Sequence, residues 1–109
     1  MARLGLASRG AGLVTHVVLF RFREDATSVD REALLRELAK FPQRFAGMQR
    51  WRLGRNVSRR DGRFSHAFVV EFADQADLLA YLADPWHEAF VHDRWWPLIE
   101  ERAIASVEH

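Results

Sequence analysis

The stretch THVVLFRFR, residues 15–23, decides the fold, because its side chains alternate between two faces as they do along a β-strand. One face carries His16, Val18 and Phe20, and the other begins with Val17. Both faces therefore begin with apolar residues, and we expect each to be covered over part of its length.

Two further strands with a turn between them follow later in the chain. Residues 48–58 and residues 64–72 have strand-like patterns, and Asp61-Gly62 between them is a strong signal for a hairpin turn, which we place at residues 59–62. The C-terminal residues 102–107 are expected to form a short last strand.

Capping residues and helical spacing predict helices after the first and third strands. Thr27 or the following serine caps the first helix, in which leucines recur at helical spacing. Asp74 caps the next helix, and Asp84-Pro85 ends it, because the residue before a proline avoids the helical region. A further helix is expected from Pro85 onward, bent near Pro97.

The resulting order, β-α-β-β-α-β, predicts an α+β domain with the ferredoxin-like arrangement. The helices of this arrangement cover one face of a four-stranded sheet, so the other face needs a cover, and a second copy of the chain is the simplest one. We therefore expect a homodimer through the open sheet face. Residues 14–109 are expected to form one domain, preceded by a flexible N-terminal extension over residues 1–13.

The composition of the 109 residues argues against several classes of function. A net charge of +1 gives no reason to expect nucleic acid or an anionic membrane as a partner. The absence of cysteine excludes disulfides, thiolate nucleophiles and cysteine-based metal sites. No apolar stretch approaches the roughly 18 residues needed to span a bilayer, and the N-terminal residues are too weakly apolar for a secretory signal. We expect a cytoplasmic protein.

Two of the five histidines lie near the starts of predicted strands, in phase with apolar residues. If the first and third strands are neighbours, His16 and His66 both face the layer beneath the helices, as do Phe20 and Phe68. We treat these four residues as candidate substrate-binding groups. The alternative is a structural role, since a lone histidine at a strand start more often serves the fold.

Tyr81 and His87 lie on either side of the predicted helix break at Asp84-Pro85. On one continuous helix they would be about 240° apart around the axis, so only a turn at Pro85 lets them converge. An imidazole with a pKa near 6.5 can accept a proton at neutral pH, and a phenol with a pKa near 10 can donate a hydrogen bond to a developing enolate. Such proton transfers need no cofactor. In the alternative, Tyr81 packs in the core and His87 caps a helix.

The other candidate sites are weaker. His87 and His92 resemble a zinc-protease motif, but their spacing of five residues sets them about 140° apart on a helix, so no metal is expected. Arginines gather over residues 50–63, where a charged sheet edge that resists aggregation explains them better than a phosphate site.

Four segments in order resemble the stress-responsive A/B-barrel (Dabb) family: HVVLFRF, GRNVSRRDGRF, SHAFVVEFAD and YLADPWHEAF. The resemblance covers about residues 15–107. It implies a ferredoxin-like βαββαβ protomer whose sheet packs against its twin to form a dimeric α/β barrel.

One branch of the family, the olivetolic acid cyclases, closes a linear poly-β-ketone thioester by an aldol condensation without a cofactor. The resemblance implies that Tyr81 and His87 match the catalytic pair of that branch. His16, His66 and Phe90 match residues of its pocket. Asp84 stands where the branch has a histidine, which is a departure from its pattern.

Three hypotheses about function follow. The first is a cofactor-independent lyase or cyclase for a carbonyl-bearing, polyketide-like small molecule, with His87 as general base and Tyr81 at the carbonyl oxygen. The second is a non-catalytic dimeric stress-response or ligand-binding protein, in which these residues are structural. The third is a cofactor-free monooxygenase or a haem-degrading enzyme.

Overall fold

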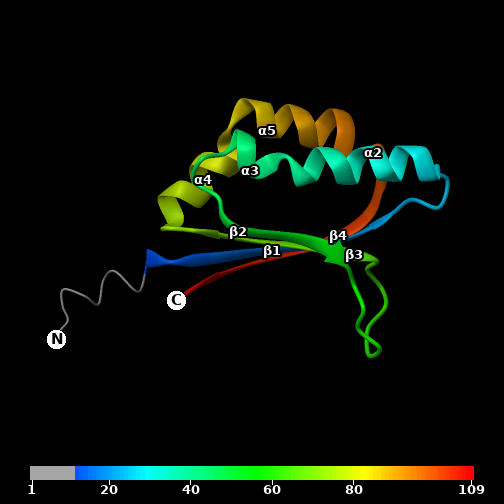
Figure 1. Cartoon of the computed structure of the whole chain (residues 1–109), viewed down its shortest axis with the longest axis horizontal. Helices are drawn as coiled ribbons and strands as arrows, with labels where there is room; N and C mark the ends of the chain where they lie inside the picture. Colours follow the sequence, from blue (N-terminus) through cyan, green and yellow to red (C-terminus); the bar gives the residue numbers. More distant parts are fainter. Residues whose placement is uncertain (1–11) are drawn as a thin grey trace.

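The computed structural model describes residues 12–109, so the predicted extension at residues 1–13 falls almost wholly outside the described residues (Figure 1). Strands and helices occur in the expected order. In chain order they are β1 (Val14–Phe22), α2 (Ser28–Ala39), α3 (Phe41–Arg44), β2 (Gln49–Arg55), β3 (His66–Phe72), α4 (Gln75–Ala83), α5 (Pro85–Phe90), the π-helix η1 (Val91–Trp95) and β4 (Ile99–Glu108).

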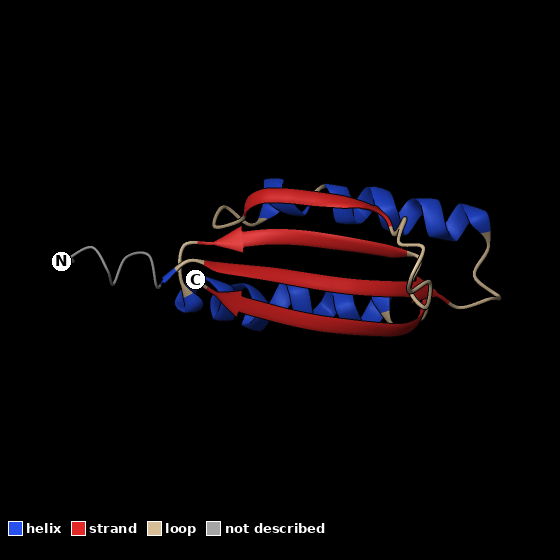
Figure 2. Ribbon diagram, turned by 90° about the horizontal axis from the view of Figure 1, so that it is seen from below, coloured by secondary structure: helices blue, strands red, loops and turns tan. Residues whose placement is uncertain are grey.

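The four strands form one sheet in the order β2-β3-β1-β4, with every neighbouring pair antiparallel. Each helical segment connects two parallel strands that have a third strand between them, which is the ferredoxin-like arrangement. Figure 1 shows the helices on one side of the sheet, and Figure 2 shows the strands of the opposite face with no element in front of them. The predicted α+β ferredoxin-like fold is confirmed.

Strand β1 shows why this sequence folds as a sheet with one covered face. Val14, Val18, Phe20 and Phe22 are buried beneath the helices, and the residues between them are half-buried on the other face. The period of two thus separates a buried set from a set that meets solvent in the single chain. Val17 lies in this second set, on the face that the helices leave open within residues 12–109.

Side-chain caps fix the starts of the helices where the sequence predicts them. The Thr27 hydroxyl accepts a hydrogen bond from the Asp30 N–H at 3.1 Å, and an Asp74 carboxylate oxygen accepts one from the Asp77 N–H at 2.9 Å. Each bond satisfies a backbone donor that a first helical turn leaves free. Helix α2 then buries Leu34 against the sheet.

The two edge strands differ most from the prediction. Strand β2 is shorter than residues 48–58, and the predicted turn at residues 59–62 is part of a longer loop, in which the Asn56 amide donates to the Phe64 carbonyl at 2.8 Å. Strand β4 is longer than residues 102–107, because it pairs with β1 along its whole length. Its side chains after Ile99 are exposed, so no strong alternation marks its ends.

A bulge in β2 turns its aromatic residue toward the core. The register shifts between Gln49 and Arg52, and Arg50 has the left-handed φ of 56°. Such a conformation costs a non-glycine residue on the order of 1 kcal/mol. The bulge lets Trp51 stack on Phe68, with 4.7 Å between the ring centroids.

Helix α5 continues directly into η1, and the wider turn separates two neighbouring tryptophans. The Trp96 N–H donates to the Val91 carbonyl at 2.9 Å, a bond five residues long. Trp95 is buried and Trp96 is 61% exposed. The expected bend near Pro97 therefore takes the form of a π-turn just before it. Within residues 12–109, every helix is too short or too polar to cross a membrane.

Candidate active site

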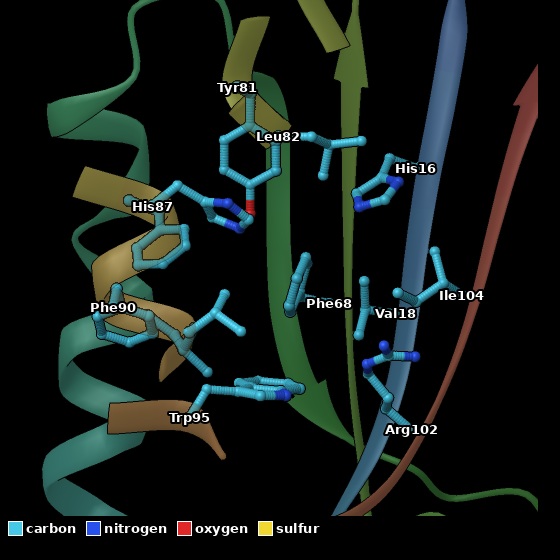
Figure 3. Close-up of a pocket in the computed structure, with 13 residues that line it drawn as sticks. His16, Val18, Phe68, Tyr81, Leu82, His87, Phe90, Trp95, Arg102 and Ile104 are labelled. Atoms are coloured by element: carbon cyan, nitrogen blue, oxygen red, sulfur yellow. The ribbon is translucent and has the colours of Figure 1, made fainter. Parts of the chain in front are cut away.

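A cavity of about 160 Å³ lies between the sheet and the helices (Figure 3). Most of its wall is apolar. The apolar side chains include Val18, Leu38, Phe41, Phe68, Phe90 and Trp95. Four polar side chains complete the lining: His16 from β1, Tyr81 from α4, His87 from α5 and Arg102 from β4. An apolar pocket with a few convergent polar groups is the usual form of a small-molecule site.

The turn at Asp84-Pro85 brings Tyr81 and His87 together. Asp84 ends α4 and begins α5, where its carboxylate accepts hydrogen bonds from the backbone N–H groups of Trp86 at 2.8 Å and His87 at 3.3 Å. The two rings then lie 4.3 Å apart between centroids, at an angle of 51°. The break thus brings the two side chains together, whereas a single continuous helix would have pointed them in different directions.

Tyr81 sits in an aromatic box. Its ring stacks on Phe72 with 5.6 Å between centroids and meets the edge of Phe45 at 5.0 Å. The residue is 5% exposed, and burial raises the pKa of its phenol, so the hydroxyl keeps its proton throughout the physiological range. The ring is therefore held in place by its aromatic contacts, and its hydroxyl can donate a hydrogen bond.

His87 is half-buried, and its imidazole is uncharged at neutral pH. Burial lowers its pKa, against the opposing effects of the Leu82 backbone and the charges of Asp84 and Glu88. Its Nδ1 atom is buried and has no hydrogen-bond partner within the part of the chain that the structure describes. An unsatisfied buried nitrogen is costly for the fold, and a catalytic role is one of the explanations for such an atom.

His16 is the third titratable group of the cavity. It is 2% exposed, and a hydrogen bond of 2.8 Å joins its Nδ1 to the Ser106 hydroxyl on β4. Burial, with a contribution from His87, lowers the pKa of His16 to about 4. Its ring centroid lies 6.2 Å from that of Tyr81, so the cavity holds two neutral imidazoles beside one neutral phenol.

The structure separates the predicted site residues into two groups. His16, Phe68, Tyr81, His87 and Phe90 line the cavity together.

Phe20 and His66 lie outside the lining. They stack on each other with 5.5 Å between centroids, on the same face of the sheet, and the Ser65 hydroxyl lies 2.8 Å from Nδ1 of His66. Burial, with the charges of Arg55 and Arg31, lowers the pKa of His66. The expectation that β1 and β3 are neighbours is confirmed. The helices also bury Phe20, but the cavity lies toward the His16 end of this face and does not reach Phe20 or His66.

Sequence reasoning missed the contribution of β4: Arg102 lines the cavity, and Ser106 is hydrogen-bonded to His16. They share the helix-facing side of the strand with Ile104. The pattern over residues 102–107 predicted a strand, but nothing in it indicated that the strand pairs with β1. Within residues 12–109 no group of three or more histidine and carboxylate side chains is placed to hold a metal ion.

Comparisons with solved structures place this fold among known ones. A Dabb family protein with a ferredoxin-like fold from Mesorhizobium loti is 28% identical, with a TM-score of 0.81, and the match covers 90% of this chain and 97% of that one. The hydroxynitrile lyase from Passiflora edulis is 20% identical, with a TM-score of 0.80 and coverage of 91% and 94%. At that identity the likeness concerns the fold alone.

A third structure, a dimeric ferredoxin-like protein of unknown function from Thermobifida fusca, is 20% identical, with a TM-score of 0.76 and coverage of 91% of this chain and 92% of that chain. No curated protein sequence matches this chain. The model of the stress responsive A/B barrel domain family matches residues 14–108, nearly the whole of the described chain. This chain therefore belongs to the stress responsive A/B barrel domain (Dabb) family.

Proposed function

We propose that the cavity is the active site of a lyase or cyclase that acts on a small carbonyl compound by acid–base catalysis. The observation that carries the proposal is the pairing of an uncharged imidazole with a protonated phenol, 4.3 Å apart between ring centroids, in the wall of an apolar cavity. Proton transfer beside a carbonyl needs a base and a hydrogen-bond donor, and these two side chains supply both.

The reaction begins at the carbon next to the substrate carbonyl. His87 removes a proton from that carbon, while the Tyr81 hydroxyl donates a hydrogen bond to the carbonyl oxygen as it becomes an enolate. In a cyclase the enolate carbon then forms a bond to a second carbonyl carbon of the same molecule. The imidazolium returns its proton to the new alkoxide. In a lyase the same bond breaks by the reverse steps.

The size of the cavity limits the substrate. An engineered apolar cavity of about 150 Å³ in another protein accommodates benzene, so the cavity of about 160 Å³ in this chain fits roughly one ring with few further atoms. The predicted likeness to the olivetolic acid cyclases stays a prediction, and the proposed reaction does not depend on it.

We also propose that the protein is a homodimer through the open sheet face. Half-buried Val17, Leu19 and Val69 lie on that face of the central strands, and Ala105 and Val107 continue it on β4. A patch of this kind is typical of a surface that a partner covers. The Thermobifida fusca protein, whose sheet has the same fold, is dimeric.

Proton exchange at carbon tests the catalytic proposal without knowledge of the natural substrate. Phenylacetone, a one-ring ketone, is incubated with the protein in deuterated water, and loss of its α-proton signal is followed by NMR. We expect exchange that the His87→Ala variant loses by about 10²–10⁴-fold. Tyr81→Phe, which keeps the ring and removes the hydroxyl, should slow exchange while leaving binding of the ketone intact.

The control for this experiment is His92→Ala, an exposed histidine five residues along the chain. Its exchange rate should equal that of the wild type, and thermal unfolding should show that all three variants are folded. Exchange that persists in folded His87→Ala protein would remove this residue from the role of base.

The second candidate function is ligand binding without catalysis. It is favoured by the aromatic contacts of Tyr81, which explain that residue as part of the core. In that case phenylacetone binds and no exchange occurs. Within the third hypothesis, haem degradation has less support, because a haem is several times larger than this cavity.

A further inference from the structure

Arg102 contributes a positive charge to the cavity at the end away from the candidate base. In the pairing of β1 with β4, His16 lies opposite Ser106, Val18 opposite Ile104, and Phe20 opposite Arg102. Arg102 is therefore four positions along the ladder from the His16 end, which corresponds to roughly 13 Å of strand. Figure 3 shows its side chain beside Val18, reaching from β4 toward the cavity and apart from Tyr81 and His87.

The two acidic residues that precede Arg102 on β4 form ion pairs with other arginines. Glu101, its neighbour on the opposite face of β4, lies 2.8 Å from Arg21, and Glu100 lies 3.8 Å from Arg23. Within residues 12–109, the structure gives Arg102 neither an ion pair nor a hydrogen bond to its guanidinium. Arg102 is an exposed residue, so its five N–H donors meet solvent at the margin of the apolar cavity and have no protein acceptor within residues 12–109.

The rest of the lining leaves this charge uncompensated. His16 and His87 are uncharged at neutral pH, Tyr81 keeps its proton, and the lining contains no carboxylate. The one formal charge among the side chains that line the cavity is therefore the guanidinium of Arg102, at its solvent-exposed margin. A guanidinium binds a carboxylate through two parallel hydrogen bonds, which fixes the orientation of the ligand as well as its charge.

We propose that Arg102 binds a carboxylate of the substrate, and that the substrate is a carbonyl compound with this carboxylate at the end opposite its reacting carbonyl. The substrate class is then a small apolar keto acid or aldehyde acid, about one ring in size, that lies along β1 between Arg102 and the Tyr81–His87 pair. This inference rests on the proposed function for the position of the carbonyl. The carboxylate contact depends only on the position of Arg102 on β4.

A matched pair of probes tests the charge. 4-(2-Oxopropyl)benzoate is phenylacetone with a carboxylate opposite the ketone side chain, and its methyl ester has nearly the same shape without the charge. Titration calorimetry should show that the wild-type protein binds the acid about 10- to 100-fold more tightly than the ester, as expected for a charged hydrogen-bonded contact. Added salt should weaken binding of the acid and leave binding of the ester unchanged.

Three variants locate that preference. Arg102→Met keeps most of the length and apolar stem of the side chain and should bind acid and ester equally. Arg102→Lys keeps the charge without the fork and should retain part of the preference. Arg60→Met removes an exposed arginine from the loop between β2 and β3, and it should leave the preference as it is in the wild type. Failure of the wild-type protein to bind the acid, or an acid preference that survives in Arg102→Met, overturns the proposal.

The same probes separate this inference from the catalytic one. An acid preference that depends on Arg102, in a protein that exchanges no α-proton of any probe, supports the carboxylate site and contradicts the catalytic role of His87. If exchange depends on His87 but is equally fast for acid and ester, in wild type and in Arg102→Met, the catalytic role of His87 is supported and the carboxylate site is contradicted. Sedimentation should show that Arg102→Met has the same oligomeric state as the wild type. If Arg102→Met is instead a monomer, and the wild type shows no preference for the acid, Arg102 belongs to the subunit interface and the proposal is overturned.

Discussion

The imidazole of His16 lies between Phe68 and Tyr81, where a positive charge is out of reach of water. In the unfolded chain the same imidazole takes up a proton near pH 6.5. In the folded protein burial lowers its pKa to about 4. Between these two values the unfolded state binds more protons than the folded state, so a fall in pH favours unfolding.

The stability of the protein should therefore decrease on the acid side of neutrality. Above pH 6.5 both states hold a neutral His16, and the full free energy of unfolding is present. As the pH falls from 6.5 to about 4, His16 should remove on the order of 2–3 kcal/mol. Urea unfolding of the wild type at pH 7 and at pH 4.5 measures the loss.

Comparison of two variants assigns that loss. His16→Asn places an amide near the position of Nδ1, where it can still bond to Ser106, but it has no proton to gain in this range. It should show a clearly smaller decrease between pH 7 and pH 4.5 than the wild type. His92→Asn, at an exposed position, should decrease as the wild type does. If His16→Asn also decreases as the wild type does, the acid sensitivity lies in other groups, of which His87 and His66 are the first to examine.

At the scale of elements, Asp84 is the residue that connects α4 to α5. Its carboxylate satisfies the first backbone donors of α5, and its extended backbone ends α4. The same residue therefore sets the angle at which His87 faces Tyr81. A defect in this cap should weaken the fold modestly and also disturb the pairing of the two rings.

Replacement of Asp84 by Ala should lower the free energy of unfolding by about 0.5–2 kcal/mol, the usual cost of a lost helix cap. Asp74→Ala, which removes the matching cap of α4, should cost a similar amount. Only Asp84→Ala should also slow α-proton exchange, because only this cap positions His87. Asp84→Asn, which retains a capping oxygen, should restore the stability. Equal exchange rates in both alanine variants would show that Asp84 serves the fold and not the site.

At the scale of the whole molecule, the open face of the sheet exposes apolar side chains that a single chain leaves without a partner surface. Val17 and Leu19 on β1 and Val69 on β3 are half-buried there, and no helix or strand of residues 12–109 covers them. A salt bridge of 3.2 Å between Arg50 and Glu71 lies toward its margin. An apolar centre with a charged margin is the usual anatomy of a protein interface.

Substitution of Val69 by Lys should convert the proposed dimer to a monomer, because an ammonium group in the centre of the proposed interface loses its water without gaining a partner. Sedimentation equilibrium measures the change. Val57→Lys is the matched control, since Val57 is 80% exposed in the loop between β2 and β3. A wild-type monomer, or a Val69→Lys protein that remains dimeric, would show that the subunits do not meet through this face.

The sequence by itself determined what local physical chemistry controls. The alternation over residues 15–23 specifies a strand with one buried face, and Thr27 and Asp74 mark helix starts by their hydrogen-bonding oxygens. The Asp84-Pro85 pair specifies a break, because proline restricts the residue before it wherever the chain goes. These signals also bring Tyr81 and His87 to one turn, so this part of the candidate site was readable before the structure.

Only the tertiary structure decided which residues meet across distant segments. Phe20 and His66 share a face with His16, but the cavity ends before them, because the crossing point of the helices over the sheet depends on packing and not on periodicity. Arg102 joins the site because β4 pairs with β1 in one register, and an exposed edge strand carries little local pattern from which that register can be read. Contacts of this kind arise from the burial of the whole chain, so the charge in the cavity became visible only in the folded molecule.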